Sequence, residues 1–583
     1  LVAYAYPPSS GEGRAELYYS PAEGAWKYLY RSDKDDALVA GMSSPTAVPV
    51  LILKEGATRT TGRDARRSNI YAARVIAEAL ATSLGPRGMD KLLIDSFGNA
   101  TITGDGATIL KEMEVQHPAA KMLVEVAKAQ DDEVGDGTTS VVVLAGQLLA
   151  QASELLDQEI HPSIITEGFE KAMEYSLKII DEIAKPVEPL DPNVLKNVAV
   201  TALSSKVVAE FKDFLADLVV KAALQVVEER DGRYVLPMDN VKVEKKKGES
   251  LTESILVKGI VLDKEVVHPA MPKRIENAKI ALIDAPLEVE KPEWTAKINV
   301  TNPEQLRQFL EQEATILRNM VEKIRAAGAN VVFCQKGIDD LAQYYLAKAG
   351  ILAVRRVKKS DMEKLARATG ARIVTKVEDI SPDALGTAKL VEERKVADEK
   401  MVFVEGCPNP KAVTILIRGG AEHIVDEAER SVHDALSVIR NIMREPKIVA
   451  GGGAVEIELA MRLREYARKL PSKEQLAVMK YAEALETIPS ILAQTAGLEP
   501  VDVLAELRKR HSAGEKWVGV DVIGGKVADM MKLNVIEPAL VKKQVIKSAT
   551  EAAVMILRID DIIAAAPPKE KEKKGGKEET SFD

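Results

Sequence analysis

Six consecutive residues, Gly135-Asp136-Gly137-Thr138-Thr139-Ser140, combine a turn that carries a carboxylate with three hydroxyls at the start of an apolar stretch. Glycine lets backbone N–H groups come close to oxygen atoms, and a helix that begins near Thr138 would present free donors with a partial positive charge. Asp136 could hold a hard cation such as Mg²⁺, which prefers oxygen ligands. The pattern predicts a site for a metal-bound phosphate chain, although a capped helix start with a solvated aspartate explains it equally well.

Three further segments rich in glycine could approach the same kind of ligand. Leu84 to Gly88 is a predicted loop, and Gly104-Asp105-Gly106 places a second carboxylate between two glycines just before another helix. Gly451-Gly452-Gly453 occurs late in the chain. Glycine is suited to such places because a Cβ would occupy the space of the ligand.

The elements that must position these residues are mainly helices. Apolar residues recur at helical spacing from Ser68 to Leu84, and Gly85-Pro86 predicts the end of that helix. Lys91 to Ile102 predicts a hairpin of two short strands that leads to the second carboxylate. The ranges 119–130 and 138–158 are apolar on more than one side, which favours helices inside a bundle.

The middle of the chain has another pattern, in which short apolar stretches alternate with amphipathic ones. The predicted strands are 279–287, 330–335, 351–357 and 371–377. Helical patterns return after Gly420 and cover 424–443, 455–470, 473–497 and 539–566. The sequence therefore predicts an α/β domain inserted between two helical halves, with Gly451-Gly452-Gly453 near the first half.

Composition excludes several classes of function. A chain of 583 residues predicts about three or four domains. Apolar residues make up 46% and aromatic residues only 4%, which is typical of helix-rich and α/β packing. Because 80 basic residues are outnumbered by 89 acidic ones, the net charge of −9 offers no basic surface for nucleic acid.

The cysteine and apolar patterns indicate the compartment. Cys334 and Cys407 are far apart and form no CxxC pair, so neither a zinc ribbon nor a disulfide framework is predicted. No uninterrupted apolar run reaches about eighteen residues, the length of a membrane-spanning helix. We therefore expect a soluble protein of the reducing cytoplasm.

Both ends differ from the rest of the chain. Residues 1–41 mix Tyr, Pro, Gly and charges without a helical or strand period, and we expect Met42 to be the natural start, with 1–41 an upstream extension. Residues 568–583 form a tail dominated by Lys, Glu and Gly that has too little apolar surface to order itself. Mobile ends are expected.

Four motifs together resemble one known family. Leu84-Gly85-Pro86-Arg87-Gly88-Met89-Asp90, Thr103-Gly104-Asp105-Gly106-Ala107-Thr108, the Gly135–Ser140 segment and Gly451-Gly452-Gly453 occur in the order and approximate spacing seen in chaperonins. The resemblance is closest to the group II chaperonins, the archaeal thermosome and its eukaryotic cytosolic relatives. It covers residues 42–567 and leaves the terminal extensions outside.

The resemblance implies an ATP-dependent folding chaperone. Double rings of identical or sister subunits would enclose non-native proteins, and ATP with Mg²⁺ would drive the cycle. A built-in lid would close the cavity, so that no separate co-chaperonin is needed. Neither nucleic acid nor a membrane is expected as a partner.

The resemblance also implies a multidomain α and α/β fold. A mostly helical equatorial ATPase domain would comprise 42–190 and 446–567, a small intermediate domain 191–260 and 412–445, and an inserted α/β apical domain 261–411 with a helical protrusion near 293–318. The amphipathic run Pro303 to Ile324 fits that protrusion and fits an ordinary domain helix equally well.

Individual roles follow from the same resemblance. Asp136 would be the metal ligand, and Asp105 and Asp434 would position and polarise the water that attacks the γ-phosphate. The residues implied to hold the nucleotide are Leu84, Gly85, Pro86, Gly137, Thr138, Thr139, Ser140, Lys206, Gly452, Gly453 and Glu537. Without the resemblance, Asp434 would be a solvent-facing helix residue, Lys206 a surface lysine and Glu537 a carboxylate at a helix start.

Two other functions stay open. A small-molecule enzyme that uses ATP, such as a kinase or ligase, would employ the α/β insert as its substrate domain, but neither a GxxxxGK[ST] loop nor a full GxGxxG pattern occurs. A non-hydrolysing scaffold with the chaperonin fold is disfavoured by the joint presence of Asp105, Asp136 and Asp434.

Overall fold

The computed structural model describes residues 13–20, 25–32, 58–289, 303–408 and 412–564. The chain divides into two compact units, Leu1–Thr58 with Ile563–Asp583, and Arg59–Ile562. In the first unit, β1 (Gly13–Ser20) and β2 (Ala25–Ser32) pair antiparallel. The expectation of no strand in residues 1–41 was therefore wrong, because aromatic-rich segments with high strand propensity pair there. The predicted tail 568–583 lies outside the described residues.

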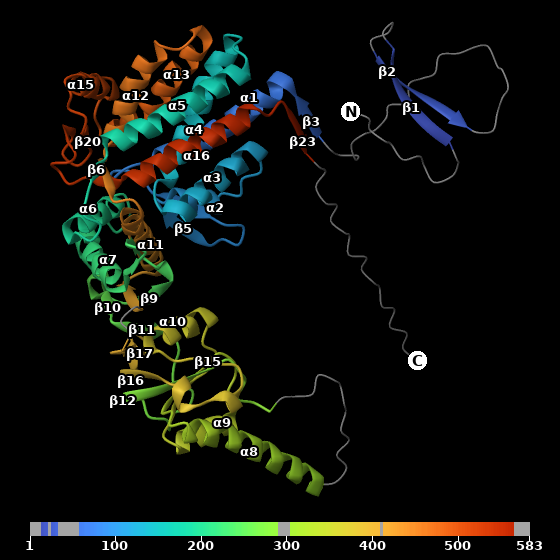
Figure 1. Cartoon of the computed structure of the whole chain (residues 1–583), viewed down its shortest axis with the longest axis vertical. Coiled ribbons are helices and arrows are strands. Elements are labelled where there is room, and N and C mark those ends of the chain that lie inside the picture. Colours follow the sequence, from blue (N-terminus) through green and yellow to red (C-terminus); the bar gives the residue numbers. More distant parts are fainter. Residues whose placement is uncertain (1–12, 21–24, 33–57, 290–302, 409–411, 565–583) are drawn as a thin grey trace. The chain divides into compact units, whose positions relative to one another are not determined.

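Helices from both halves of the second unit share one apolar core (Figure 1). They are α1 (Gly62–Ala81), α2 (Gly106–Glu112), α3 (Pro118–Val134), α4 (Thr138–Asp157), α5 (Pro162–Ile183), α12 (Ala454–Ala467), α13 (Ser472–Leu485), α14 (Thr487–Thr495), α15 (Pro500–Ser512) and α16 (Ala539–Leu557). Side chains of α16 and α4 pack in this core although the two helices are far apart in sequence. The predicted return of the chain to the first helical half is confirmed.

Short strands lie in the segments that connect these helices. The hairpin predicted for Lys91 to Ile102 is confirmed as β4 (Lys91–Ile94) paired with β5 (Ala100–Thr103). The others are β3 (Thr58–Thr61), β6 (Lys185–Pro186), β19 (Lys447–Ala450), β20 (Val518–Asp521), β21 (Lys526–Asp529), β22 (Ile536–Pro538) and β23 (Asp561–Ala564).

Some predicted helix ends were wrong. The range 473–497 contains two helices, α13 and α14, which are separated at Glu486, a buried carboxylate bound by Arg464 and Arg508. The helix predicted to reach residue 566 ends at Leu557 and the chain continues as β23, where Asp561 accepts hydrogen bonds from Arg59. Long-range ion pairs of this kind leave no trace in the apolar period of the sequence.

The inserted part is an α/β layer around a seven-stranded mixed sheet of order β11-β17-β16-β12-β13-β14, with β15 paired to β12. Its strands are β11 (Gly259–Leu262), β12 (Arg274–Ile283), β13 (Val331–Cys334), β14 (Leu352–Val354), β15 (Ile373–Val374), β16 (Gly386–Val396) and β17 (Glu399–Glu405). Helices α8 (Pro303–Ala326), α9 (Asp340–Lys348) and α10 (Lys359–Thr369) contribute to its core. The four predicted strands are confirmed, and of the predicted protrusion 293–318 the first part lies outside the described residues.

A third large core joins the chain before and after the insert. It is built from α6 (Pro192–Leu203), α7 (Lys212–Val226), β7 (Glu228–Arg230), β8 (Arg233–Val235), β9 (Val241–Lys247), β10 (Ile255–Val257), β18 (Val413–Gly419) and α11 (Glu422–Arg444). In its three-stranded sheet, β18 lies between β10 and β9. The domain borders implied by the resemblance stay predictions.

One described helix, α4, is long and apolar enough to cross a membrane by length and composition. Its residues Val141 to Ala145 and Leu148, Leu149 are buried in the shared helical core, which accounts for its apolar character. Both cysteines lie in the described part of the chain and are free thiols, Cys334 buried and Cys407 half-buried.

Candidate active site

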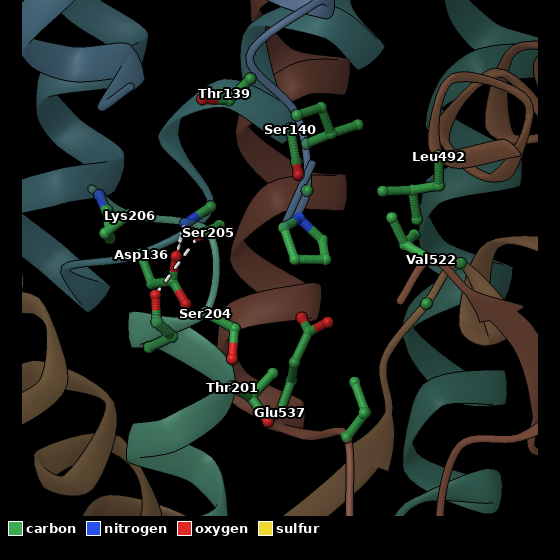
Figure 2. Close-up of a pocket in the computed structure, with 18 of the residues that line it drawn as sticks. Asp136, Thr139, Ser140, Thr201, Ser204, Ser205, Lys206, Leu492, Val522 and Glu537 are labelled. Atoms are coloured by element: carbon green, nitrogen blue, oxygen red, sulfur yellow. Dashed lines mark hydrogen bonds between the residues drawn. The ribbon is translucent and has the colours of Figure 1, made fainter. Parts of the chain in front are cut away.

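A cavity of about 450 Å³ lies where the helical core meets α6 and the segment after it. Its lining comes from stretches that are far apart in sequence, namely 83–86, 104–105, 136–140, 197–206, 212–213, 452–453, 488–492, 520–523 and 530–545. Figure 2 shows polar residues such as Asp136, Ser204 and Ser205 on one side and the apolar Leu492 and Val522 on the opposite side. The cavity suits a ligand with one polar and one apolar end.

All but one of the residues singled out from the sequence line this cavity. They are Leu84, Gly85, Pro86, Asp105, Asp136, Gly137, Thr138, Thr139, Ser140, Lys206, Gly452, Gly453 and Glu537. Asp434 does not line it, but its carboxylate contacts Lys206, which does. The structure thus brings the whole predicted set to one place, while the role of each residue stays a prediction.

The N-terminus of α4 opens at the polar side of the cavity. Gly137 is its N-cap with a φ of +79°, and no side chain caps the first turn. Gln130 Nε2 donates to the carbonyl oxygen of Asp136 at 2.8 Å, and the Gly137 N–H donates to Asp136 Oδ1 at 2.7 Å. The loop is therefore held by Gln130 of α3 and by its own Asp136, and the free N–H groups of the first turn can donate hydrogen bonds to a phosphate.

The two glycines before α12 are required by the protein itself. A Cβ at Gly452 would lie 2.8 Å from Met530 Cε and 2.9 Å from the Val520 carbonyl oxygen, and one at Gly453 would lie 2.7 Å from Pro489 Cβ. Both glycines also have positive φ angles, +64° and +76°. Packing against the chain's own atoms is thus a sufficient reason for both glycines, and the reason inferred from the sequence, that a Cβ would fill the ligand's space, stays a prediction.

Lys206 joins two aspartates from distant parts of the chain. Its Nζ lies 3.1 Å from Asp105 Oδ1 and 2.9 Å from Asp434 Oδ2, and all three side chains are largely buried. Asp105 also caps α2, where Oδ2 accepts the N–H of Thr108 at 3.0 Å and its hydroxyl at 2.8 Å. Asp434 comes from α11, so the group forms only while that helix lies against the loop of Asp105.

Burial and charge act in opposite directions on these groups. Burial disfavours the charged form of Asp105, but Lys206 and the bonds from Thr108 outweigh it and lower its pKa to about 2. Burial likewise disfavours the Lys206 ammonium, yet Asp105 and Asp434 hold its pKa well above the usual range. Burial, with Asp105 nearby, raises the pKa of Asp434 although Lys206 opposes this effect. The single positive charge of Lys206 thus lies between two carboxyl groups. A further cation bound near them would therefore be favoured.

A second ion-paired group, missed in the sequence, lies at the other edge of the cavity. Lys542 of α16 contacts Glu456 at 2.9 Å and Glu537 at 3.0 Å. Burial disfavours the charged form of Lys542, but the two glutamates outweigh this effect and raise its pKa. Burial raises the pKa of Glu537 while Lys542 opposes it. No pattern around Lys542 marks it, because a lysine on an amphipathic helix is ordinarily exposed.

Hydroxyl and amide side chains of α6 and the following turn also escaped the sequence analysis. Asn197, Thr201, Ser204 and Ser205 line the cavity beside Lys206, and Ile488, Leu492, Val520 and Val522 form its apolar wall. Ser204 accepts a hydrogen bond from Lys212 Nζ at 3.2 Å. These residues become neighbours only through the packing of α6 against β22 and α14.

The carboxylates are too dispersed for a metal site made by protein alone. Within the described ranges, no group of three or more His, Cys, Asp or Glu side chains could hold a metal ion. Burial raises the pKa of Asp136, so that a cation beside it would favour the carboxylate form. Mg²⁺ typically binds through one or two carboxylates plus phosphate oxygens and waters, which matches a single aspartate at a phosphate-binding helix start.

Comparisons with known proteins agree with this arrangement. Residues 76–567 match the TCP-1/cpn60 chaperonin family. The thermosome subunit alpha of Aeropyrum pernix is 63% identical over 520 residues, which cover 88% of this chain and 94% of that protein. The thermosome subunit of Pyrococcus horikoshii is 59% identical and the thermosome subunit beta of Archaeoglobus fulgidus 60% identical, each over 520 residues that cover 89% of this chain and 95% of the relative.

The match spans both helical halves, the insert and the segments between them, so it includes every part that lines the cavity. Identity at this level along nearly the whole length of the relatives leaves no room for a different fold. The chain belongs to the TCP-1/cpn60 chaperonin family, as a group II chaperonin.

Proposed function

We propose that this chaperonin subunit binds ATP in the cavity next to α4 and hydrolyses it with Asp105, Lys206 and Asp434 gathered around the terminal phosphate. The chain is a subunit of an ATP-dependent, double-ring protein-folding chaperone and is an ATP hydrolase. The finer assignment of residues to roles is the proposal.

The contact of Lys206 with both Asp105 and Asp434 carries the proposal. It lies beside a helix N-terminus with uncapped N–H groups and at the polar side of a cavity whose other side is apolar. The N-terminus of α4 with Thr138, Thr139 and Ser140 would hold phosphates, and Leu492 and Val522 would contact the base. Glu537, beside Lys542, would accept hydrogen bonds from the ribose or base.

Asp136 would hold Mg²⁺. Its Oδ1 is oriented by the N–H of Gly137, and the side chain lines the cavity at the start of α4. Held there by Asp136, Mg²⁺ would supply positive charge that offsets the negative charge developing on the phosphate.

Hydrolysis needs a positioned water more than it needs covalent chemistry by the protein. Asp105 and Asp434 would accept hydrogen bonds from that water, and Lys206 would keep the two carboxylates close together without mutual repulsion. Because Asp434 is carried by α11, the water is positioned only when this helix lies against the Asp105 loop. Turnover would therefore depend on a conformation, which lets nucleotide state shift the population of closed subunits.

The same proposal names the partners of this protein and its cellular location. Identical or sister subunits would complete the rings, and non-native proteins would be the clients. We propose that a built-in protrusion including part of α8 closes the cavity, so that no separate co-chaperonin is required, and that the protein works in the cytoplasm. Large apolar side chains exposed on α8, Phe309, Leu310 and Ile316, support a role of this helix in contacts with other chains.

The test is Asp434→Ala, assayed for phosphate release from ATP with Mg²⁺ on assembled protein. We expect turnover to fall by about two to three orders of magnitude, since a positioned group at the reacting phosphate is lost, with rings still visible by electron microscopy. Asp426→Ala is the matched control, because Asp426 lies on the same helix and pairs with Lys245 at the surface. Its turnover should be unchanged.

Full turnover in Asp434→Ala would remove this residue from the mechanism. Absence of turnover in the unchanged protein, with rings intact, would instead support a scaffold that does not hydrolyse ATP.

A further inference from the structure

A buried hydrogen bond outside the cavity connects the Asp105 loop to α11. Thr103, the last residue of β5, is fully buried, and its hydroxyl donates to Glu427 Oε2 at 3.1 Å. The same hydroxyl oxygen accepts the backbone N–H of Asp105 at 3.0 Å. One side chain thus links the backbone of Asp105 to the helix that carries Asp434. Figure 1 shows α11 next to β5.

Glu427 and Asp434 lie on the same face of α11, since seven residues make about two helical turns. Glu427 is 1% exposed and Asp434 is 8% exposed. Glu427 Oε2 also accepts hydrogen bonds from Arg430, at 3.1 Å from Nε and 2.7 Å from Nη2, while its Oε1 is buried without a hydrogen-bond partner among the described residues. A half-satisfied buried carboxylate opposes folding, and the bonds from Thr103 and Arg430 offset this cost only in part.

We propose that Thr103 and Glu427 are positioning residues for ATP hydrolysis, an inference that rests on the proposed function. Glu427 orients the Thr103 hydroxyl by accepting its hydrogen, so that the hydroxyl oxygen faces the N–H of Asp105. Two turns along the same helix, Asp434 meets Lys206, which also contacts Asp105. The Asp105 loop and α11 are thus connected by the Thr103–Glu427 hydrogen bond and by Lys206. Together these two contacts fix the distance between Asp105 and Asp434.

Neither Thr103 nor Glu427 lines the cavity. Loss of their contact should therefore affect the chemical step and leave nucleotide binding almost unchanged, because misplacement of a catalytic group acts on kcat. A residue that only stabilised the fold would show no such separation of kcat from KM.

The experiment compares Thr103→Val, which keeps the shape and removes the hydroxyl, with Thr103→Ser, which keeps the hydroxyl. In Thr103→Val we expect kcat for ATP to fall about ten- to a hundredfold, with KM and the affinity for ADP within about twofold of the unchanged protein. Thr103→Ser should recover most of the rate. Glu427→Gln should lower kcat less, because its amide oxygen can still accept from Thr103, and the double variant should be no slower than Thr103→Val, because both changes act on one interaction.

Thr550→Val is the matched control. It removes another buried threonine hydroxyl, one that bonds to the Tyr481 hydroxyl at 2.7 Å in the helical core and lies outside the cavity. We expect it to lower stability and to leave kcat unchanged. An equal loss of kcat in Thr550→Val would mean that destabilisation alone explains Thr103→Val.

Asp434→Ala in the same assay separates this inference from the proposed function. Full kcat in Thr103→Val, or a raised KM alone, while Asp434→Ala is inactive would overturn the positioning role and leave the proposed function in place. Turnover by Asp434→Ala would contradict the proposed function itself. Should Thr103→Val fail to assemble, an unchanged kcat in Glu427→Met, which has no oxygen to accept from Thr103, would overturn the inference.

Discussion

At single positions, Gly137 shows how the turn that carries Asp136 depends on glycine. Its φ is +79°, and a Cβ there would lie 2.8 Å from Val545 Cγ2 on α16. The left-handed backbone conformation and the nearness of α16 therefore both require glycine at this position. The close approach, in turn, holds the N-terminus of α4 at the cavity.

Gly137→Ala should therefore lower the free energy of unfolding by about 2 to 5 kcal/mol, since the left-handed conformation opposes a Cβ by about 1 to 2 kcal/mol and overpacking adds about 1 to 3 kcal/mol. Gly497→Ala is the control, because Gly497 has a φ of +78° but nothing within 4 Å of its Cβ position. The shift of the guanidinium midpoint, followed by circular dichroism, should be clearly smaller for Gly497→Ala. Equal shifts would show that the contact with Val545 contributes nothing.

Among the elements, the junction of α13 and α14 depends on Glu486. This carboxylate is 5% exposed and accepts paired hydrogen bonds from Arg464 of α12, at 2.6 and 2.7 Å, and further bonds from Arg508 of α15. Burial opposes its ionisation, but the bonds from Arg464 and Arg508 prevail and hold the pKa of Glu486 below the usual range. One acid thus connects the junction of α13 and α14 with both α12 and α15.

Glu486→Gln should lower the free energy of unfolding at pH 7 by about 1 to 3 kcal/mol, as expected for hydrogen bonds to a charged group. A carboxyl with a lowered folded-state pKa stabilises above its unfolded pKa of about 4.3 and loses that effect as pH falls through the folded value. The difference between the two proteins should therefore shrink when denaturant unfolding is repeated below about pH 4. A difference that stays constant with pH would contradict a role of the charge.

Glu483→Gln is the control for this change. Glu483 pairs with Lys480 at 2.7 Å near the surface of the same helix, and exposed pairs contribute little. The free energy of unfolding of Glu483→Gln should differ little from that of the unchanged protein, both at pH 7 and below about pH 4.

At the scale of the whole molecule, the described residues form three large apolar cores: the helical core, the core of the α/β insert and a middle core. The chain passes through the middle core once on its way into the insert and once on its way back. The middle core is built from segments on both sides of the α/β insert, so movement of the insert is transmitted through β9, β18 and α11. Because α11 also bears Asp434, this connection would couple ATP turnover to movement of the insert under the role proposed for Asp434.

The purified chain with ATP and Mg²⁺ alone should therefore protect a denatured client from protease and release it folded, without any added lid protein. Under the same conditions, electron microscopy with an ATP transition-state mimic should show stacked rings that close. Chelation of Mg²⁺ should stop both turnover and release, since phosphate charge is then not neutralised. Release that requires a second protein would contradict the built-in lid, and persistent monomers would indicate that partner subunits are needed.

Much of the fold could be predicted from the sequence because its signals are local. The hairpin β4–β5, the helices α3 and α4 and the strands β12 to β15 were found from periodicity and turn residues. β16 and β17 were not predicted, because much of β16 is charged and only half-buried, which hides the strand period. The break at Glu486 was missed although Pro489, in the first turn of α14, is a local signal for it, and the end of α16 was missed because apolar residues, Ile562 and Ile563, continue beyond Leu557.

By itself, the sequence determined the family, the order of the glycine motifs and the cavity residues near them, since these signals are short motifs of neighbouring residues. Only the tertiary structure decided that Lys206 lies between Asp105 and Asp434, and that Lys542 is buried between Glu456 and Glu537. A charged residue is exposed by default and becomes part of a site only when separate elements bury it with partners. The physical reason is that the cost of burying a charge is offset by neighbours that are distant along the chain.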